Sequence, residues 1–98
     1  MILTGKQKRY LRALAVNENA IFQIGKDGLN DNLYKSVLDA LKPRELVKIS
    51  VLKTCELDTR KIADEICLKT NSELVQIIGR TIVIYKRNTK EPKILLPW

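Results

Sequence analysis

The hydrophobic positions of this chain follow two spacings, one typical of helices and the other typical of strands. The first segment has helical spacing, and its inward positions are Gln7, Leu11, Leu14 and Ala15. Thr4 and Gln7 form a Thr-x-x-Gln capping box, in which each side chain can bond the free backbone N–H of the other residue. We therefore predict an N-terminal helix with one narrow buried stripe.

Two later segments share this spacing and carry helix start and stop signals. Asn30 or Asp31 can cap a second helix, and Pro43 is expected to end it, because proline disfavours the helical conformation in the residue before it. Asp58 can cap a third helix. The inward-facing residues are expected to be Leu33, Val37, Leu38 and Leu41 in the second helix and Ile62, Ala63, Ile66 and Cys67 in the third.

Four short apolar runs lie between or after these helices and are typical of strands. Residues 20–24 form a β-branched run that is followed at once by glycine, and residues 45–52 alternate apolar and polar side chains. Residues 73–78 and 81–86 are separated by Gly79 and Arg80, and a Gly-X pair is the turn chemistry of a tight two-residue hairpin. We therefore predict that the last two strands form a hairpin.

The predicted order of elements is α-β-α-β-α-β-β. Each strand-helix-strand step is expected to be a right-handed crossover between parallel strands, and the hairpin adds an antiparallel strand. We predict the α/β fold class, as a single-domain αβαβαββ sandwich with a mixed four-stranded sheet. The length fits one domain over residues 1–98, with a core at about 3–87 and a C-terminal tail at 88–98. A chain of this size can bury roughly two thirds of its unfolded-state surface.

The residue types that the chain lacks exclude several classes of chemistry. There is no histidine, which excludes Ser-His-Asp catalysis, Cys-His catalysis and His-liganded metals. Cys55 and Cys67 are too few for a four-cysteine zinc site, and we expect both to be ordinary reduced cysteines. Asp58, Asp64 and Glu65 belong to a surface helix and lack the buried pairing that carboxylate catalysis requires. We expect no enzymatic activity, no cofactor and no metal.

The hydrophobic runs are also too short for a membrane segment. No run approaches the ~20 apolar residues that span a bilayer. The N-terminal sequence MILTGKQKRY becomes basic before any apolar stretch develops, so it does not resemble a secretory signal. We expect a cytoplasmic, monomeric protein without membrane contact.

The formal net charge of +7 is unevenly distributed along the chain. Residues 1–54 hold 10 Lys/Arg and 5 Asp/Glu, residues 55–79 hold 3 and 5, and residues 80–98 hold 5 and 1. The basic residues of the predicted first helix are Lys6, Lys8, Arg9 and Arg12. The first 17 residues contain no acid at all. Small basic proteins are common, but a positive excess confined to two stretches favours a surface that faces a polyanion.

Residues 25–28, Gly-Lys-Asp-Gly, form a GxxG loop between the predicted first strand and second helix. Gly25 and Gly28 let the backbone turn sharply and expose N–H groups, and the positive end of the next helix adds to their field. Lys26 supplies a mobile charge at the tip, and GxxG loops of KH domains clamp nucleic-acid backbones in this way. Glycines are also common in such turns for steric reasons, and Asp27 opposes a phosphate, so the loop alone leaves both interpretations open.

Four blocks of the sequence carry a more specific signal. They are LTGKQKRYLRALA (3–15), IFQIGKDGLNDNL (21–33), LKPRELVKISVL (41–52) and ELVQIIGRTIVIYK (73–86). Together, and in this order, they resemble the CRM domain (chloroplast RNA splicing and ribosome maturation), in particular its stand-alone bacterial YhbY-type members. The resemblance implies an α/β RNA-binding domain similar in architecture to the C-terminal domain of translation initiation factor three.

The function implied by the resemblance is the binding of structured RNA, namely ribosomal RNA of the large-subunit precursor, during assembly of that subunit. Basic residues would neutralise phosphates, and Arg44 and Lys48 together with the first helix would flank the glycine loop. The candidate RNA-binding residues are Gly25, Lys26, Asp27, Gly28, Lys6, Lys8, Arg9, Arg12, Lys35, Arg44 and Lys48. Many relatives carry histidines just after the first helix, where residues 16–19 of this chain are Val-Asn-Glu-Asn, so no role is inferred there.

The alternative function is that of a protein–protein adaptor whose basic face docks an acidic, ribosome-associated partner. Its best feature is the C-terminal run from Ile94 to Trp98, because Trp is a favoured interface anchor. The simpler expectation for this run is that it packs on the sheet of its own domain.

Overall fold

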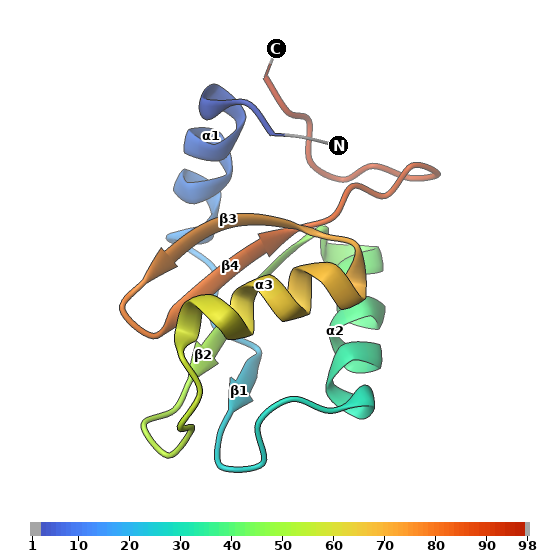
Figure 1. The fold of residues 1–98 in the computed structure, drawn as a ribbon. Helices are drawn as coiled ribbons and strands as arrows, with labels where there is room; N and C mark the ends of the chain where they lie inside the picture. The colour runs from blue at the N-terminus through green and yellow to red at the C-terminus, as the bar shows by residue number, and fades with distance from the viewer. Residues whose placement is uncertain (1–2, 98) are drawn as a thin grey trace.

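The computed structural model describes residues 3–97, and the elements occur in the predicted order (Figure 1). They are α1 (Gly5–Ala15), β1 (Phe22–Ile24), α2 (Asp31–Arg44), β2 (Leu46–Val51), α3 (Thr59–Thr70), β3 (Glu73–Ile78) and β4 (Thr81–Tyr85). The first, second and fourth strands are slightly shorter than predicted, and the third has the predicted bounds. The fold is therefore the expected small α/β domain with a mixed four-stranded sheet.

The strand order in the sheet is β1-β2-β4-β3. β1 pairs with β2 in parallel, as predicted, while β4 pairs antiparallel with both β2 and β3. β2 and β3 consequently run in the same direction, as the predicted crossover between parallel strands requires, and β4 lies between them in the sheet. Ile82, Val83, Ile84 and Tyr85 are all buried, and such a strand needs a central position, whereas β3 is half-exposed and suits an edge.

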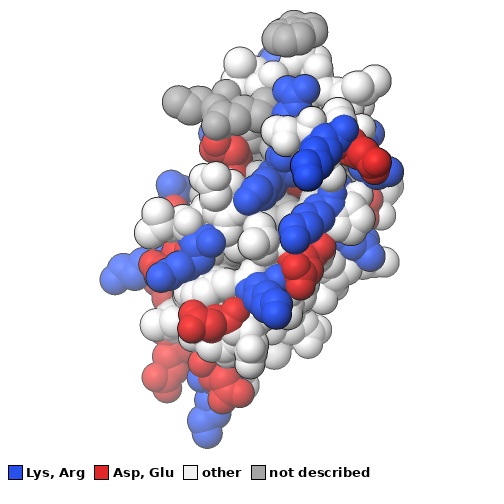
Figure 2. Space-filling view, turned by 90° about the vertical axis from the view of Figure 1, so that its right-hand side faces the viewer, with Lys and Arg blue, Asp and Glu red and all other residues white. Residues whose placement is uncertain are grey.

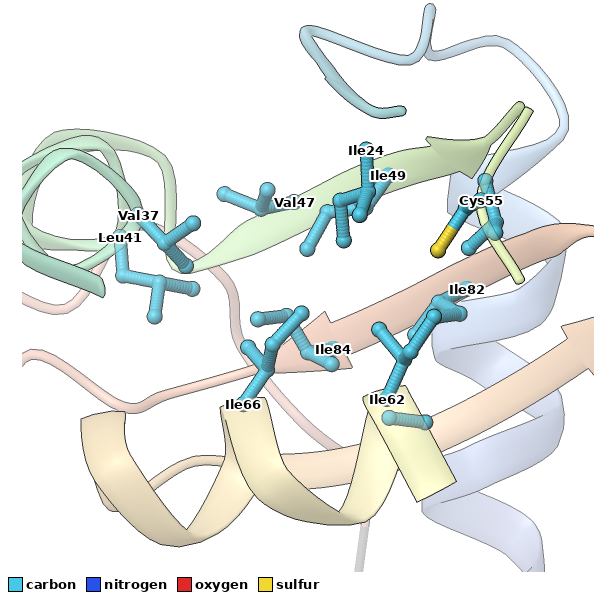
Figure 3. Packing of buried hydrophobic residues seen from close by; sticks show 12 residues of the cluster. Ile24, Val37, Leu41, Val47, Ile49, Cys55, Ile62, Ile66, Ile82 and Ile84 are labelled. Carbon is cyan, nitrogen blue, oxygen red and sulfur yellow. The ribbon is translucent and has the colours of Figure 1, made fainter. Parts of the chain in front are cut away.

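Two hydrophobic clusters lie on opposite faces of the sheet. The larger cluster packs α2 and α3 on one face, where Val37 and Ile66 approach Ile49, Ile84 and their neighbours from the helix side (Figure 3). The smaller cluster packs α1 and the C-terminal tail on the other face. The domain is thus a sheet covered on both sides, which is the predicted sandwich.

The helices begin where their capping residues predict. The side chain of Thr4 accepts from the backbone N–H of Gln7 at 3.1 Å and that of Gln7 accepts from the N–H of Thr4 at 3.0 Å, which completes the capping box. Asn30, rather than Asp31, caps α2, and Asp58 caps α3. Most predicted inward residues of these helices pack on the larger cluster, but Leu38 is half-buried outside it.

The end of α2 differs from the prediction, because the helix continues through Pro43 to Arg44. A proline in the last turn removes a single helical hydrogen bond, which the turn can lose. The helix ends because Glu45 adopts a positive φ of 61°, a conformation that turns the chain out of the helix and into β2.

Glu45 is fully buried and holds the segment that follows β4. Its carboxylate accepts the backbone N–H groups of Asn88 at 2.9 Å, Ile94 at 2.7 Å and Lys93. Its own carbonyl accepts the N–H of Lys86 at 2.8 Å. A single side chain from the end of α2 therefore fixes the course of the C-terminal tail.

The tail packs on its own domain as expected. Ile94 and Leu96 are partly buried against the smaller cluster, and the side-chain amide of Gln7 donates to the carbonyl of Pro97 at 3.1 Å. Leu95 points away and is exposed. Trp98, the proposed interface anchor, lies outside the described residues.

Candidate nucleic-acid interface

The glycine loop is a closed turn at the end of β1. The N–H of Gly28 donates to the carbonyl of Gly25 at 3.0 Å, and Gly28 has a φ of +65°, which favours glycine. A Cβ on Gly25 would lie 3.4 Å from both Leu52 Cδ1 and Thr54 Oγ1. Gly28 is therefore required by its backbone conformation, and Gly25 by the close approach of neighbouring side chains. Lys26 is exposed at the tip of the turn.

A second loop, residues 52–57, lies beside the glycine loop. Because β1 and β2 are parallel neighbours, the loops that follow them leave the sheet at the same end. The N–H of Leu52 donates to the carbonyl of Ile24 at 2.8 Å, and a Cβ on Gly28 would be 3.5 Å from Leu57 Cδ1. The two loops line an open hollow of about 470 Å³. The residues of the second loop were not among those predicted from the sequence, although the expected parallel pairing of the strands was a signal for them.

The charge around this hollow is slightly negative rather than positive, because one cation faces two acids. Lys26 shares the hollow with Asp27 and Glu56. The side chain of Asn30 already accepts the N–H of Leu33 at 2.8 Å, and Asp31 lies in the first turn of α2, so the positive end of the helix is partly neutralised. Most of the positive charge for a polyanion must therefore come from elsewhere.

The largest uncompensated positive charge is on α1. Its buried stripe of Gln7, Leu11 and Ala15 faces the sheet, so its basic side chains project into solvent. The exposed basic residues of the helix are Lys6, Lys8, Arg9 and Arg12. Within residues 3–97 none of these four cations forms an ion pair with an acid. Such a row of unpaired cations is suited to a polyanion.

Lys48 has a structural role at the far end of α1. Its ammonium group donates to the carbonyl of Ala15 at 3.2 Å and to that of Glu18 at 3.4 Å, so it caps the C-terminal end of the helix. It also lines, with Arg12, a shallow hollow of about 50 Å³. The structure therefore brings these two predicted residues together, beside α1 rather than beside the glycine loop.

The remaining candidates lie along α2. Lys35 is exposed in the half of the helix that follows the glycine loop. Arg44 is the last of the 14 residues of α2, and at the usual helical rise the two ends are about 20 Å apart. Arg44 consequently does not flank the loop. The loop and the start of α1 likewise lie at opposite ends of the view in Figure 1.

The two cysteines are shielded from solvent to different degrees. Cys55 is buried in the larger cluster, and burial raises the pKa of the half-buried Cys67 thiol, which keeps it in the less reactive neutral form. Among residues 3–97 no three Cys, Asp or Glu side chains are grouped so that they would hold a metal ion. None of the helices described is both long and apolar enough to cross a bilayer.

Comparison with known proteins gives a consistent family assignment. The sequence profile of the CRS1 / YhbY (CRM) domain matches residues 3–86. "Probable RNA-binding protein YqeI" of Bacillus subtilis is 49% identical, with 98% of this chain and 100% of that protein covered. An "RNA-binding protein" of Haemophilus influenzae is 34% identical over 97% of this chain and 95% of its own length. The solution structure of the hypothetical protein SAV1595 from Staphylococcus aureus has a TM-score of 0.81 and 50% identity, covering 98% of this chain and 100% of that one.

Proposed function

The chain belongs to the CRS1 / YhbY (CRM) domain family, and on this premise we propose that it is an RNA-binding protein without catalytic activity. The observation that carries the proposal is the row of exposed basic side chains on α1. In the described part of the chain they have no acidic partner, so they are available to phosphates. The glycine loop contributes a second contact, because the exposed Lys26 at its tip is available to an RNA phosphate.

We further propose that the ligand is structured RNA, and specifically ribosomal RNA of the large-subunit precursor in the cytoplasm. Aromatic residues make up only 5% of the sequence, which is too few for a platform that stacks single-stranded bases. Recognition then depends on phosphate positions and RNA shape, which folded RNA provides. The resemblance to ribosome-maturation proteins supports the choice of ribosomal RNA.

The dependence of affinity on salt tests the binding mechanism. If about four to six phosphates are neutralised, the logarithm of the association constant should fall with the logarithm of salt concentration with a slope of about −3 to −5. The measurement is a filter-binding or fluorescence titration with a transcribed large-subunit ribosomal RNA between low and physiological salt. An affinity that hardly changes with salt would contradict a phosphate-based mechanism.

Crosslinking in cells tests the identity of the RNA. Ultraviolet crosslinking of the tagged protein, followed by sequencing of the bound RNA, should recover large-subunit ribosomal RNA from precursor particles. Reads spread over messenger and transfer RNA would refute the ribosomal target while leaving RNA binding intact. Association with particles that survives nuclease treatment would instead support the adaptor function.

A further inference from the structure

We propose that the chain has a second RNA-phosphate site, a cleft between the C-terminal end of α2 and the segment that follows β4. This inference rests on the proposed RNA-binding function and adds a contact surface to it. The cleft has a volume of about 420 Å³ and contains four basic side chains and no acid. Its basic residues are Lys42, Lys86, Arg87 and Lys90. It lies on the side of the molecule that carries α2 and the tail, where Figure 2 shows several Lys and Arg side chains with Asp and Glu side chains among them.

The cleft is held in shape by hydrogen bonds to the ends of two helices. The side-chain amide of Asn88 donates to the carbonyl of Lys42 at 3.0 Å, at the end of α2. The ammonium group of Lys86 donates to the carbonyl of Thr70 at 2.9 Å, at the end of α3. The carboxylate of the buried Glu45 accepts the backbone N–H of Asn88. The backbone that carries the cations is therefore fixed and does not have to be ordered by a ligand.

A tight turn then directs the cations into the cleft. The side-chain oxygen of Asn88 accepts the N–H of Lys90 at 3.0 Å and that of Glu91 at 3.1 Å, which is an Asx turn. Arg87 and Lys90 flank this residue and are both exposed, and within residues 3–97 neither forms an ion pair. Both charges are thus available to an anion.

Lys42 and Lys86 contribute to different degrees. The Lys42 ammonium lies 3.8 Å from the carboxylate of Asp39, and both side chains are mostly exposed, so the pair is weak and Lys42 can exchange it for a phosphate. Lys86 already donates to the carbonyl of Thr70 and is half-buried. It therefore raises the positive potential of the cleft but does not contact the phosphate directly. The site therefore consists of Lys42, Arg87 and Lys90, whose cationic donors are suited to phosphate oxygens.

The position of the cleft determines what kind of ligand reaches it. It lies at the end of α2 opposite to the glycine loop, about 20 Å away at the usual helical rise. A free nucleotide cannot contact both places, whereas a folded RNA presents phosphates over such distances. The ligand chemistry is a phosphate in either case, and the source that the structure favours is the backbone of a folded RNA.

The test compares two double substitutions of equal charge. Arg87→Gln with Lys90→Gln removes the two exposed cations of the cleft, and Arg60→Gln with Lys61→Gln removes an exposed Arg and Lys from the first turn of α3. With a transcribed large-subunit ribosomal RNA at about 0.15 M salt, loss of two phosphate contacts should weaken binding by about 15- to 30-fold and reduce the salt slope by about 1.5. The α3 variant should stay within about 3-fold of wild type.

A charge-preserving exchange, Arg87→Lys with Lys90→Arg, should bind with nearly the wild-type affinity. Unchanged binding by the cleft variant, or an equal loss in both double variants, would overturn the second site. Melting curves of all variants are expected to stay close to wild type, because none of the substituted side chains is buried and the ion pair of Arg60 with Asp64 in α3 is exposed. If the cleft variant melts at a lower temperature than wild type, the single substitution Lys42→Gln provides an independent test. It should also weaken binding, by about 5-fold.

Amide shifts in the ¹⁵N spectrum separate this proposal from the proposed function. Addition of the RNA should shift the amides of residues 87–90 together with those of the glycine loop. If the RNA shifts neither region, the proposed function fails and the cleft fails with it. If it shifts the loop and α1 but not residues 87–90, only the cleft fails. Inorganic phosphate that shifts residues 87–90 where the RNA does not would assign the cleft to a free phosphate and overturn the RNA assignment.

Discussion

Replacing Glu45 with Gln should loosen the C-terminal tail, because one buried carboxylate holds three backbone N–H groups of that tail. One oxygen accepts from Lys93 and Ile94, and the other accepts from Asn88. The substitution keeps the size of the side chain but removes its charge and replaces one acceptor with an NH2 group. It therefore changes the hydrogen bonding of the tail without creating a cavity.

The size of the effect follows from the hydrogen bonds that change. A bond to a charged acceptor contributes about 1.5–3 kcal/mol and a neutral bond about 0.5–1.5 kcal/mol, so the bonds to Lys93 and Ile94 together lose about 2 kcal/mol. The N–H of Asn88 would face an NH2 group, and an unsatisfied buried donor costs about 1–3 kcal/mol. The total of about 3–5 kcal/mol corresponds to a fall in melting temperature of at least about 12 °C for a domain of this size.

The assay combines a thermal melt, followed by circular dichroism, with amide hydrogen exchange of the three tail residues. Glu91→Gln is the matched control, since Glu91 lies on the same segment but is exposed and its carboxylate accepts no hydrogen bond within residues 3–97. The control should melt like wild type. A Glu45→Gln variant that melts within about 2 °C of the control, with tail amides as protected as in wild type, would refute this role of Glu45.

Four further substitutions test single features of the candidate interface. Lys26→Asp should weaken RNA binding with no change in circular dichroism or melting, because Lys26 is exposed; full binding by this variant would move the site away from the loop. Lys48→Met should lower the unfolding free energy by about 1–3 kcal/mol, because it removes two hydrogen bonds at the end of α1, and a denaturant titration that shows no change would contradict this role. Gly28→Ala should lower the unfolding free energy by about 1–2 kcal/mol, because Gly28 has a positive φ. Gly25→Ala should lower it less in the same denaturant titration, and the reverse order would contradict the assigned conformations.

The elements of this fold could be predicted from sequence because their signals are local. The capping box of Thr4 and Gln7, the cap at Asp58 and the turn at Gly79 each depend on residues that are close in the chain. The position of β4 between β2 and β3 could not be read in this way, because strand order depends on which strand buries both of its faces. The continuous apolar run of residues 82–85 was the available signal.

The residues of the candidate site could be predicted from the sequence, but their arrangement in space could not. The glycine loop and the basic face of α1 are runs of sequence, and the structure leaves both exposed. Their separation, and the position of Arg44 far from the loop, depend on packing across the sheet. The role of Glu45 had no sequence signal, since a glutamate at the end of a helix is usually solvated.

The central place of β4 has a consequence for the synthesis of this protein. The strand that completes the sheet is the last to leave the ribosome, so a nascent chain that ends before residue 81 has β2 and β3 with unpaired edges and no closed core. Pairing also joins segments far apart in the chain, such as Leu46 with Tyr85, which delays folding until both have been made. The domain should therefore fold only after β4 has left the ribosome, and truncations that remove β4 should give aggregates rather than smaller folded domains.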